Sequence, residues 1–225
     1  MSEFKKLAAE KAVDYIKSGM IIGLGTGSTT YFALLKISEL LKSGGLINIK
    51  GIPSSTQTEN QAKELNIPLT NLKENPVIDL TIDGADEIDA DLNLIKGGGG
   101  ALLREKIIAQ ASRKEIIIAD DSKFSDKLGT KWAVPIEVIE FAVESEIKFL
   151  ESIGSTVKPR ISDNTIFKTD EGNVILDADF GTINSPVELA LKLERRAGIV
   201  EHGLFINLAD IVIIAGKEGI RVHNK

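Results

Sequence analysis

Short apolar runs alternate with segments of helical periodicity along residues 1–120 of the chain. The runs predict buried strands, and apolar positions three and four residues apart predict helices. The expected strands are residues 20–24, 46–52, 67–72, 77–82 and 115–119, and the expected helices are residues 3–17, 56–65, 100–111 and a segment that begins at Ser28 or Thr29 and ends near residue 41. This alternation is typical of a three-layer α/β fold with a mostly parallel sheet, whose ligands bind beyond the carboxyl ends of the strands.

The pattern changes after residue 128. Its order becomes strand, helix, strand, strand, helix, strand, which is the split βαβ order of a small ferredoxin-like domain. The expected strands are residues 132–139, 156–161, 173–179 and 202–207, and the expected helices are residues 143–153 and 185–197. An apolar strand at residues 211–215 would rejoin the large sheet. We therefore expect a Rossmann-like catalytic domain of residues 1–127 plus 208–225, with an inserted ferredoxin-like α+β domain of residues 128–207.

Composition narrows the class of protein. Hydrophobic residues make up 43% of the 225 residues and charged residues 27%, which is ordinary for a globular chain. The net charge of −6 argues against a nucleic-acid-binding surface. No apolar run is long enough to span a membrane, and the N-terminus lacks the apolar core of a signal peptide. The chain contains no cysteine, so we expect neither disulfides nor thiolate metal sites, and we expect a cytoplasmic protein.

A loop rich in glycine and hydroxyl groups, residues 23–30, follows the first predicted strand directly. Glycines let the backbone approach an anion closely, and the amides at the start of the next helix point toward it. We therefore expect Thr26, Gly27, Ser28 and Thr29 to bind a phosphate. The spacing fails the dinucleotide fingerprint, and the loop lacks the lysine of a nucleotide P-loop. A tight turn without any ligand remains the alternative.

Carboxylates follow another predicted strand, in the segment 83–91. Gly84 turns the chain so that Asp83 and Asp86 can face one pocket and exchange protons with a ligand. A solvated acidic loop and a magnesium site are the competing interpretations, although the spacing does not match an EF-hand loop.

Four consecutive glycines follow Lys96 and precede a helix. Such a run is costly to order, and an anion-binding turn that uses the amides of Gly97, Gly98 and Gly99 would explain it. Glu105, about one turn into the helix, could reach back over the pocket as a base. Lys123, beyond a further strand, could reach a phosphate or could be a solvated loop residue.

Four motifs, in this order, resemble those of the type A ribose-5-phosphate isomerase family over essentially the whole chain: Gly-x-Gly-Thr-Gly-Ser-Thr, Asp-Gly-Ala-Asp-Glu-Ile, Lys-Gly-Gly-Gly-Gly-Ala-Leu-x-Arg-Glu-Lys and Ala-Asp-x-Ser-Lys. The resemblance implies that Glu105 is the base and that Asp83, Asp86 and Lys96 are the other polar residues of the active site. It implies ligand-binding positions at Thr26, Ser28, Thr29, Lys123 and Lys5. It also implies a cofactor-free and metal-free isomerase that interconverts D-ribose 5-phosphate and D-ribulose 5-phosphate through an enediolate, as a homodimer or homotetramer.

Other functions remain open at this point. A sugar-phosphate sensor could share the fold and the phosphate loop, because a fold alone does not fix a function. Such a module usually carries a DNA-binding segment, which the sequence does not show, and it would not need Glu105 together with Lys96. An amino-sugar-phosphate isomerase or deaminase and a coenzyme A transferase are related enzyme alternatives. The missing fingerprint disfavours a nicotinamide-dependent dehydrogenase.

Overall fold

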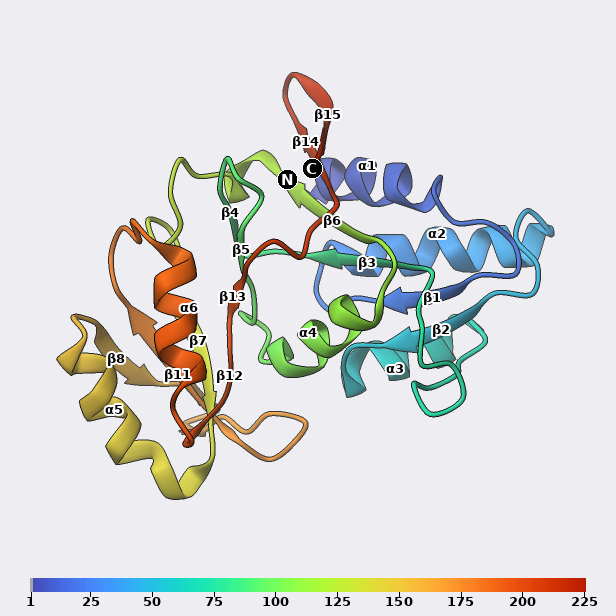
Figure 1. The fold of residues 1–225 in the computed structure, drawn as a ribbon. Helices are drawn as coiled ribbons and strands as arrows, with labels where there is room; N and C mark the ends of the chain where they lie inside the picture. Colours follow the sequence, from blue (N-terminus) through green and yellow to red (C-terminus); the bar gives the residue numbers. More distant parts are fainter. Residues whose placement is uncertain (1) are drawn as a thin grey trace. The chain divides into compact units, whose positions relative to one another are not determined.

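The computed structural model describes residues 2–225 and divides into two compact units (Figure 1). Unit 1 comprises Met1–Ala85, Arg104–Lys123 and Leu208–Lys225, and unit 2 comprises Asp86–Leu103 and Phe124–Asn207. Each unit is described by itself. Within residues 2–225, no helix has both the length and the apolar character that crossing a membrane requires.

Unit 1 is built on one six-stranded sheet. In sheet order its strands are β15 (Gly219–Asn224), β14 (Ile211–Gly216), β6 (Glu115–Asp120), β3 (Leu80–Gly84), β1 (Ile21–Leu24) and β2 (Lys50–Pro53). The neighbouring strands from β14 to β2 are all parallel, and β15 returns antiparallel along β14 as a hairpin. The mostly parallel sheet predicted from the alternation of strands and helices is therefore confirmed.

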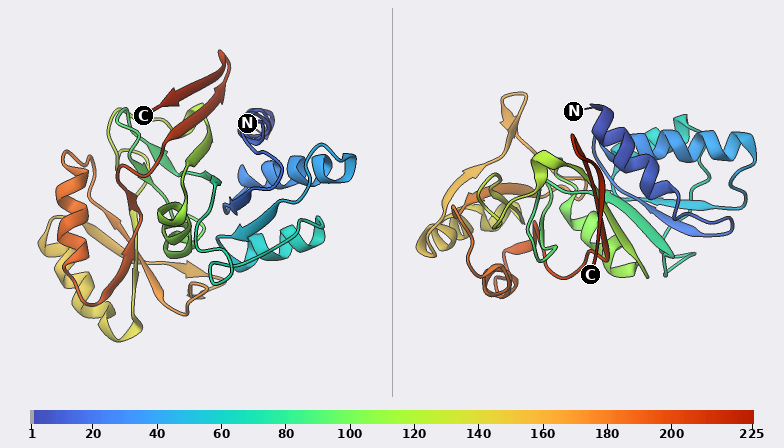
Figure 2. Two further views of the ribbon diagram at one scale, coloured as in Figure 1. Left: turned by 45° about the vertical axis from the view of Figure 1, so that its right-hand side comes forward. Right: turned by 90° about the horizontal axis from the view of Figure 1, so that it is seen from above.

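Helices cover both faces of this sheet. Helices α1 (Ser2–Val13) and α2 (Thr30–Ser43) pack on one face, and their apolar residues form one core with alternate residues of the strands, such as Ile22 and Ile116. On the other face Ile108 of α4 (Leu102–Ala111) packs with Ile52 and Ile78. A third helix, α3 (Thr56–Glu64), follows β2. The two further views in Figure 2 show α1 and α2 side by side.

Two predicted strands of this unit are wrong in extent. The segment 67–72 forms only an isolated bridge between Leu69 and Gly51, because Pro68 has no N–H to donate to a ladder. The strand expected from residue 46 begins only at Lys50, after Asn48 adopts a left-handed φ of 56°. The strand β15 was not predicted at all.

Unit 2 contains an antiparallel sheet in the order β12-β7-β11-β8. These strands and the two helices that connect them are β7 (Val134–Val138), α5 (Val143–Ser152), β8 (Thr156–Pro159), β11 (Val174–Asp179), α6 (Pro186–Glu194) and β12 (Ile199–His202). The fourth and first strands are neighbours, and so are the third and second, as in a ferredoxin-like fold. The predicted order of elements is confirmed. A short hairpin, β9 (Ile161–Ser162) with β10 (Thr165–Ile166), is inserted before β11.

A second, smaller sheet of unit 2 joins β4 (Glu87–Ile88), β5 (Leu94–Ile95) and β13 (Leu204–Phe205). The single strand predicted for residues 202–207 is therefore wrong. The chain leaves the first sheet after His202 and enters the second at Leu204. Gly203 forms the corner, where its N–H donates to Pro135 O at 2.7 Å and its carbonyl accepts from Lys96 N at 2.9 Å.

The unit boundaries differ from those that we expected from the sequence. Residues 86–103 cluster with unit 2, whereas the expected large domain contained them. The physical reason is the pairing of β5 with β13, which ties this segment to residues far along the chain.

Candidate active site

The residues expected to form the site are distributed over both units. Thr26, Asp83 and Glu105 belong to unit 1, and Asp86 and Lys96 belong to unit 2. The geometry is therefore given for each unit in turn.

Asp83 ends the buried strand β3 of unit 1 and is itself buried. Its Oδ1 accepts hydrogen bonds from Thr26 N at 3.1 Å and from Gly84 N at 2.7 Å. A Cβ atom at Gly25 would overlap the Asp83 carboxylate, so only glycine allows the loop to pass this close. The structure thus brings the glycine loop and the first carboxylate together, through backbone donors.

The Thr26 hydroxyl faces a cluster of other hydroxyls rather than the loop surface. Its Oγ1 lies 2.7 Å from Ser54 Oγ, 2.8 Å from Ser55 Oγ and 3.0 Å from Thr58 Oγ1. Ser55 also caps α3, because its Oγ accepts from Thr58 N at 3.0 Å. Thr26 therefore fixes the loop and Asp83 from behind. Sequence reasoning missed these hydroxyls, although Ser54 and Ser55 stand at the carboxyl end of β2, where ligands gather in such sheets.

Ser28 is exposed in the same loop, and Lys5 of α1 reaches it. The Lys5 Nζ atom donates to Ser28 Oγ at 2.9 Å. Thr29 is the N-cap of α2 but makes no side-chain capping hydrogen bond, in contrast to the cap predicted from the sequence. The start of α2 therefore combines helix amides, two hydroxyls and one ammonium group, which is a set of groups suited to a phosphate.

Glu105 and Lys123 are the remaining candidates in unit 1. Glu105 lies in the first turn of α4 and is only 6% exposed. Its helix lies close to β1 because a Cβ at Gly23 would overlap the Ile108 side chain. Lys123 is half-buried in a short 3-10 helix, Asp121–Lys123, directly after β6.

In unit 2, Asp86 is hydrogen-bonded to the glycine turn. Its Oδ2 accepts from Gly98 N at 2.7 Å. Gly97 and Gly100 adopt left-handed φ values of 98° and 84°, and Gly100 N donates to Gly97 O at 2.9 Å. These conformations are strained for any residue with a side chain. They explain why this segment contains so many glycines.

Lys96 precedes the turn and is 2% exposed, which is exceptional for a lysine. Its Nζ lies 5.3 Å from the centroid of the Phe205 ring, within range of a cation–π interaction. Burial of a single ammonium group beside a ring and a glycine turn provides a strong, fixed positive charge for an anionic ligand.

Glu87, next to Asp86, has a different role from the one that its acidic motif indicates. Its buried carboxylate accepts hydrogen bonds from the loop at residues 129–132. Asp89 likewise closes a local turn, because its Oδ1 accepts from Asn93 N at 2.8 Å. Part of the carboxylate cluster is therefore structural. Among residues 2–225, no group of three or more His, Asp and Glu side chains is placed to hold a metal ion.

Comparisons with known proteins agree on one family. The family model described as ribose 5-phosphate isomerase A (phosphoriboisomerase A) matches residues 50–219. A relative named ribose-5-phosphate isomerase A from Desulfatibacillum aliphaticivorans is 59% identical over 96% of this chain and 95% of its own. Ribose 5-phosphate isomerase from Plasmodium falciparum superposes with a TM-score of 0.97 at 45% identity, over 100% of this chain and 99% of that one. A D-ribose-5-phosphate isomerase structure in complex with phospho-erythronic acid has a TM-score of 0.97 at 40% identity, covering 99% of this chain and 98% of that chain.

Proposed function

Since the chain belongs to the ribose 5-phosphate isomerase A family, we propose that it interconverts D-ribose 5-phosphate and D-ribulose 5-phosphate through an enediolate. The observation that carries the proposal is the 59% identity to a relative of that name over 96% of the chain. The complex of a 40% identical structure with phospho-erythronic acid supports a phosphorylated sugar as the ligand. The reaction would serve the non-oxidative pentose phosphate pathway.

We propose that Glu105 is the catalytic base. Isomerisation removes a proton from C2 of the sugar and returns one to C1, and a single carboxylate on one face can make both transfers. The position of Glu105 in the first turn of α4, nearly excluded from water, supports this role.

Negative charge develops on the sugar oxygens as the proton leaves. The buried Lys96 ammonium and the amides of the glycine turn would stabilise that charge, because fixed donors in a dry environment need little reorganisation. Asp83 and Asp86 would shuttle protons among the hydroxyl oxygens and assist opening of the furanose ring. The chemistry needs no metal and no cofactor.

The phosphate of the sugar would bind at the start of α2. Ser28, Thr29 and the loop amides would hold it together with Lys5, which already contacts Ser28. Lys123 would add a second cation. Binding of this remote group positions the sugar and supplies free energy to the reacting end.

We also propose that the protein works in the cytoplasm as a homodimer or homotetramer. The absence of cysteine from the sequence supports the first statement, and family membership supports the second. Sedimentation at several protein concentrations would measure the oligomeric state.

The test of the reaction is ketose formation from ribose 5-phosphate by purified protein in excess chelator. We expect turnover in the unsubstituted protein and a loss of at least about 100-fold in Glu105→Gln. Glu39→Gln, an exposed residue on α2, is the control and should keep full activity. Binding of sugar phosphate without turnover would refute the proposal and favour the sensor alternative. Normal turnover in a folded Glu105→Gln variant would refute the assignment of the base.

A further inference from the structure

Arg160 of unit 2 is hydrogen-bonded both to an acid and to the glycine turn. Its Nε donates to Asp177 Oδ2 at 2.9 Å, and its Nη2 donates to Asp177 Oδ1. Its Nη1 donates to Gly97 O at 2.7 Å and to Gly98 O at 3.0 Å. The Arg160 side chain is only 14% exposed. The guanidinium group is therefore fixed on one side by a carboxylate and applied on the other to two successive carbonyl groups.

The two carbonyl groups determine where the neighbouring N–H groups point. A peptide unit is planar and trans, so its C=O and N–H point in opposite directions. Arg160 binds the carbonyl of the Gly97–Gly98 peptide, while Asp86 accepts from the N–H of the same peptide at 2.7 Å. Arg160 also binds the carbonyl of the next peptide, so the Gly99 N–H points away from the guanidinium. Gly99 is exposed, so that N–H is accessible to a ligand.

A run of glycines does not hold such an orientation by itself. Glycine has the largest conformational freedom of any residue, and no side chain of the turn can pack to restrict it. A hydrogen bond to a carbonyl also polarises its peptide, which makes the N–H on the other side a better donor. A cation at the two carbonyls therefore both orders the turn and strengthens its donors.

A hairpin reinforces the same contact. Arg160 stands directly before β9, and Phe167 directly after β10. Phe167 N donates to Arg160 O at 2.9 Å, so the two residues close the hairpin. The Phe167 ring lies 6.0 Å from the guanidinium carbon and occupies the space that a Cβ at Gly100 would need. Both ends of the hairpin therefore contact the glycine turn.

We propose that Arg160, held by Asp177, is a positioning residue of the isomerase, which orients the N–H groups of residues 97–99 toward the negatively charged oxygen of the reacting sugar. This inference rests on the proposed function, because it assigns the turn to the charge that develops during proton transfer. Arg160 itself does not touch the sugar and acts through the turn.

Unit 2 contains a matched control, the pair of Arg196 and Glu146. Arg196 Nε donates to Glu146 Oε2 at 2.9 Å, and its Nη2 donates to Glu146 Oε1 at 3.0 Å. The guanidinium carbon lies 4.4 Å from the centroid of the Phe149 ring. This pair has the same chemistry, a forked arginine–carboxylate contact beside a phenylalanine. Its printed hydrogen bonds run from α5 to the end of α6 and do not involve the turn.

The experiment compares Arg160→Lys, Arg160→Ala and Asp177→Asn with Arg196→Lys, Arg196→Ala and Glu146→Gln. The measurements are kcat and KM for ribose 5-phosphate, and Tm by calorimetry. We expect the Arg160 variants to lose about 10- to 100-fold in kcat, with a much smaller change in KM. Asp177→Asn should show a smaller loss in kcat. The Arg196 and Glu146 variants should lose Tm but keep kcat per folded molecule.

Chemical rescue separates positioning from a general loss of stability. Guanidinium chloride at low millimolar concentration should restore part of the kcat of Arg160→Ala, whereas sodium chloride at the same ionic strength should not. The same addition should leave Arg196→Ala unchanged. If Arg160→Ala does not fold, Arg160→Lys and Asp177→Asn decide the question.

Each result has one meaning. Unchanged kcat in folded Arg160→Lys and Asp177→Asn overturns the inference, and so does an equal loss of kcat in both arginine pairs. Inactivity of the unsubstituted protein on ribose 5-phosphate would instead overturn the proposed function. The two failures are therefore distinguishable.

Discussion

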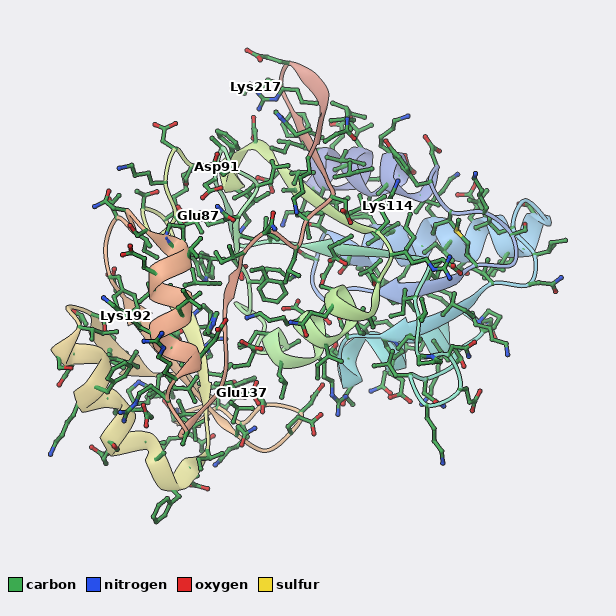
Figure 3. All side chains as sticks on the ribbon, in the orientation of Figure 1. Glu87, Asp91, Lys114, Glu137, Lys192 and Lys217 are labelled. Carbon is green, nitrogen blue, oxygen red and sulfur yellow. The ribbon has the colours of Figure 1, made fainter. Side chains whose placement is uncertain are left out.

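Glu87 provides the sharpest test of how the structure of unit 2 is held together. Its carboxylate is completely buried, and Figure 3 labels the residue. Oε1 accepts from Thr130 Oγ1 at 2.8 Å and Lys131 N at 3.1 Å. Oε2 accepts from Gly129 N at 2.9 Å and Trp132 N at 3.2 Å. One side chain thus fixes the loop that leads into β7.

The perturbation is Glu87→Gln, which keeps the size of the side chain and replaces one acceptor oxygen by an NH2 group. Whichever way the amide turns, two donors of the loop then face a donor. A hydrogen bond to a charged acceptor contributes about 1.5–3 kcal/mol. Lys131 and Trp132 are exposed, so water can replace part of the loss. We therefore expect the free energy of unfolding to fall by about 2–4 kcal/mol.

The assay is calorimetry at pH 7, in which a loss of this size lowers Tm by about 5–12 °C for a chain of this length. Asp91→Asn is the control, because Asp91 is an exposed carboxylate of the same acidic segment, also labelled in Figure 3. Its Tm should stay within about 1 °C of the unsubstituted protein. A Tm that also stays within this range in Glu87→Gln would refute the reasoning.

Three further predictions concern other parts of the chain. Gly25→Ala should lower kcat at least about tenfold and Tm by several degrees, because its Cβ overlaps the Asp83 carboxylate; equal Tm values for it and for Gly84→Ala, whose Cβ would find its nearest atoms at 3.9 and 4.0 Å, would contradict this. Lys5→Met should raise KM for ribose 5-phosphate several-fold more than it lowers kcat, since Lys5 donates to the phosphate loop; an unchanged KM would remove it from the site. Glu137→Gln should raise Tm by a few degrees at pH 8 relative to its effect at pH 4. Burial raises the pKa of Glu137, so the penalty for its charge is absent below the ordinary pKa of about 4.3 and grows as the pH rises through the folded-state value; equal Tm differences at both pH values would show that no such penalty exists.

Glu137 also shows why the glutamine variant is the informative one. Its Oε1 accepts from Thr169 Oγ1 at 2.9 Å and Asn173 Nδ2 at 2.8 Å, while Oε2 has no hydrogen-bond partner among the described residues. Glutamine can keep its oxygen at the first position and place its NH2 group at the second. The substitution therefore removes the charge and keeps both hydrogen bonds of the unit 2 strand β7.

The predicted elements and motifs agree with the structure where the information is local. Apolar runs gave β1, β3, β6 and β14 within a few residues, because a strand buried on both faces has no polar position to interrupt it. The glycines before α4 could be assigned to a special backbone, and Gly97 and Gly100 do adopt left-handed conformations. The order of elements alone was enough for the ferredoxin-like unit.

Contacts between distant residues could not be predicted in this way. The end of β12 and the start of β13 look like one apolar strand in the sequence, and only the pairing of β13 with β5 separates them. The same pairing decides that residues 86–103 belong with unit 2. Lys5 meets Ser28 across 23 residues, and Arg160 meets Gly97 across 63, at spacings that no periodicity encodes.

By itself, the sequence determined the class of fold, the family and the chemical groups available for catalysis, because these depend on residue types and on spacings within one or two elements. Only the tertiary structure decided which polar groups serve the ligand and which serve the scaffold. Asp86 and Glu87 are adjacent carboxylates of one motif, yet one binds the glycine turn and the other binds the loop at residues 129–132. Successive side chains of an extended segment point to opposite sides, so the partners on each side, brought from elsewhere in the chain, give each carboxylate its role.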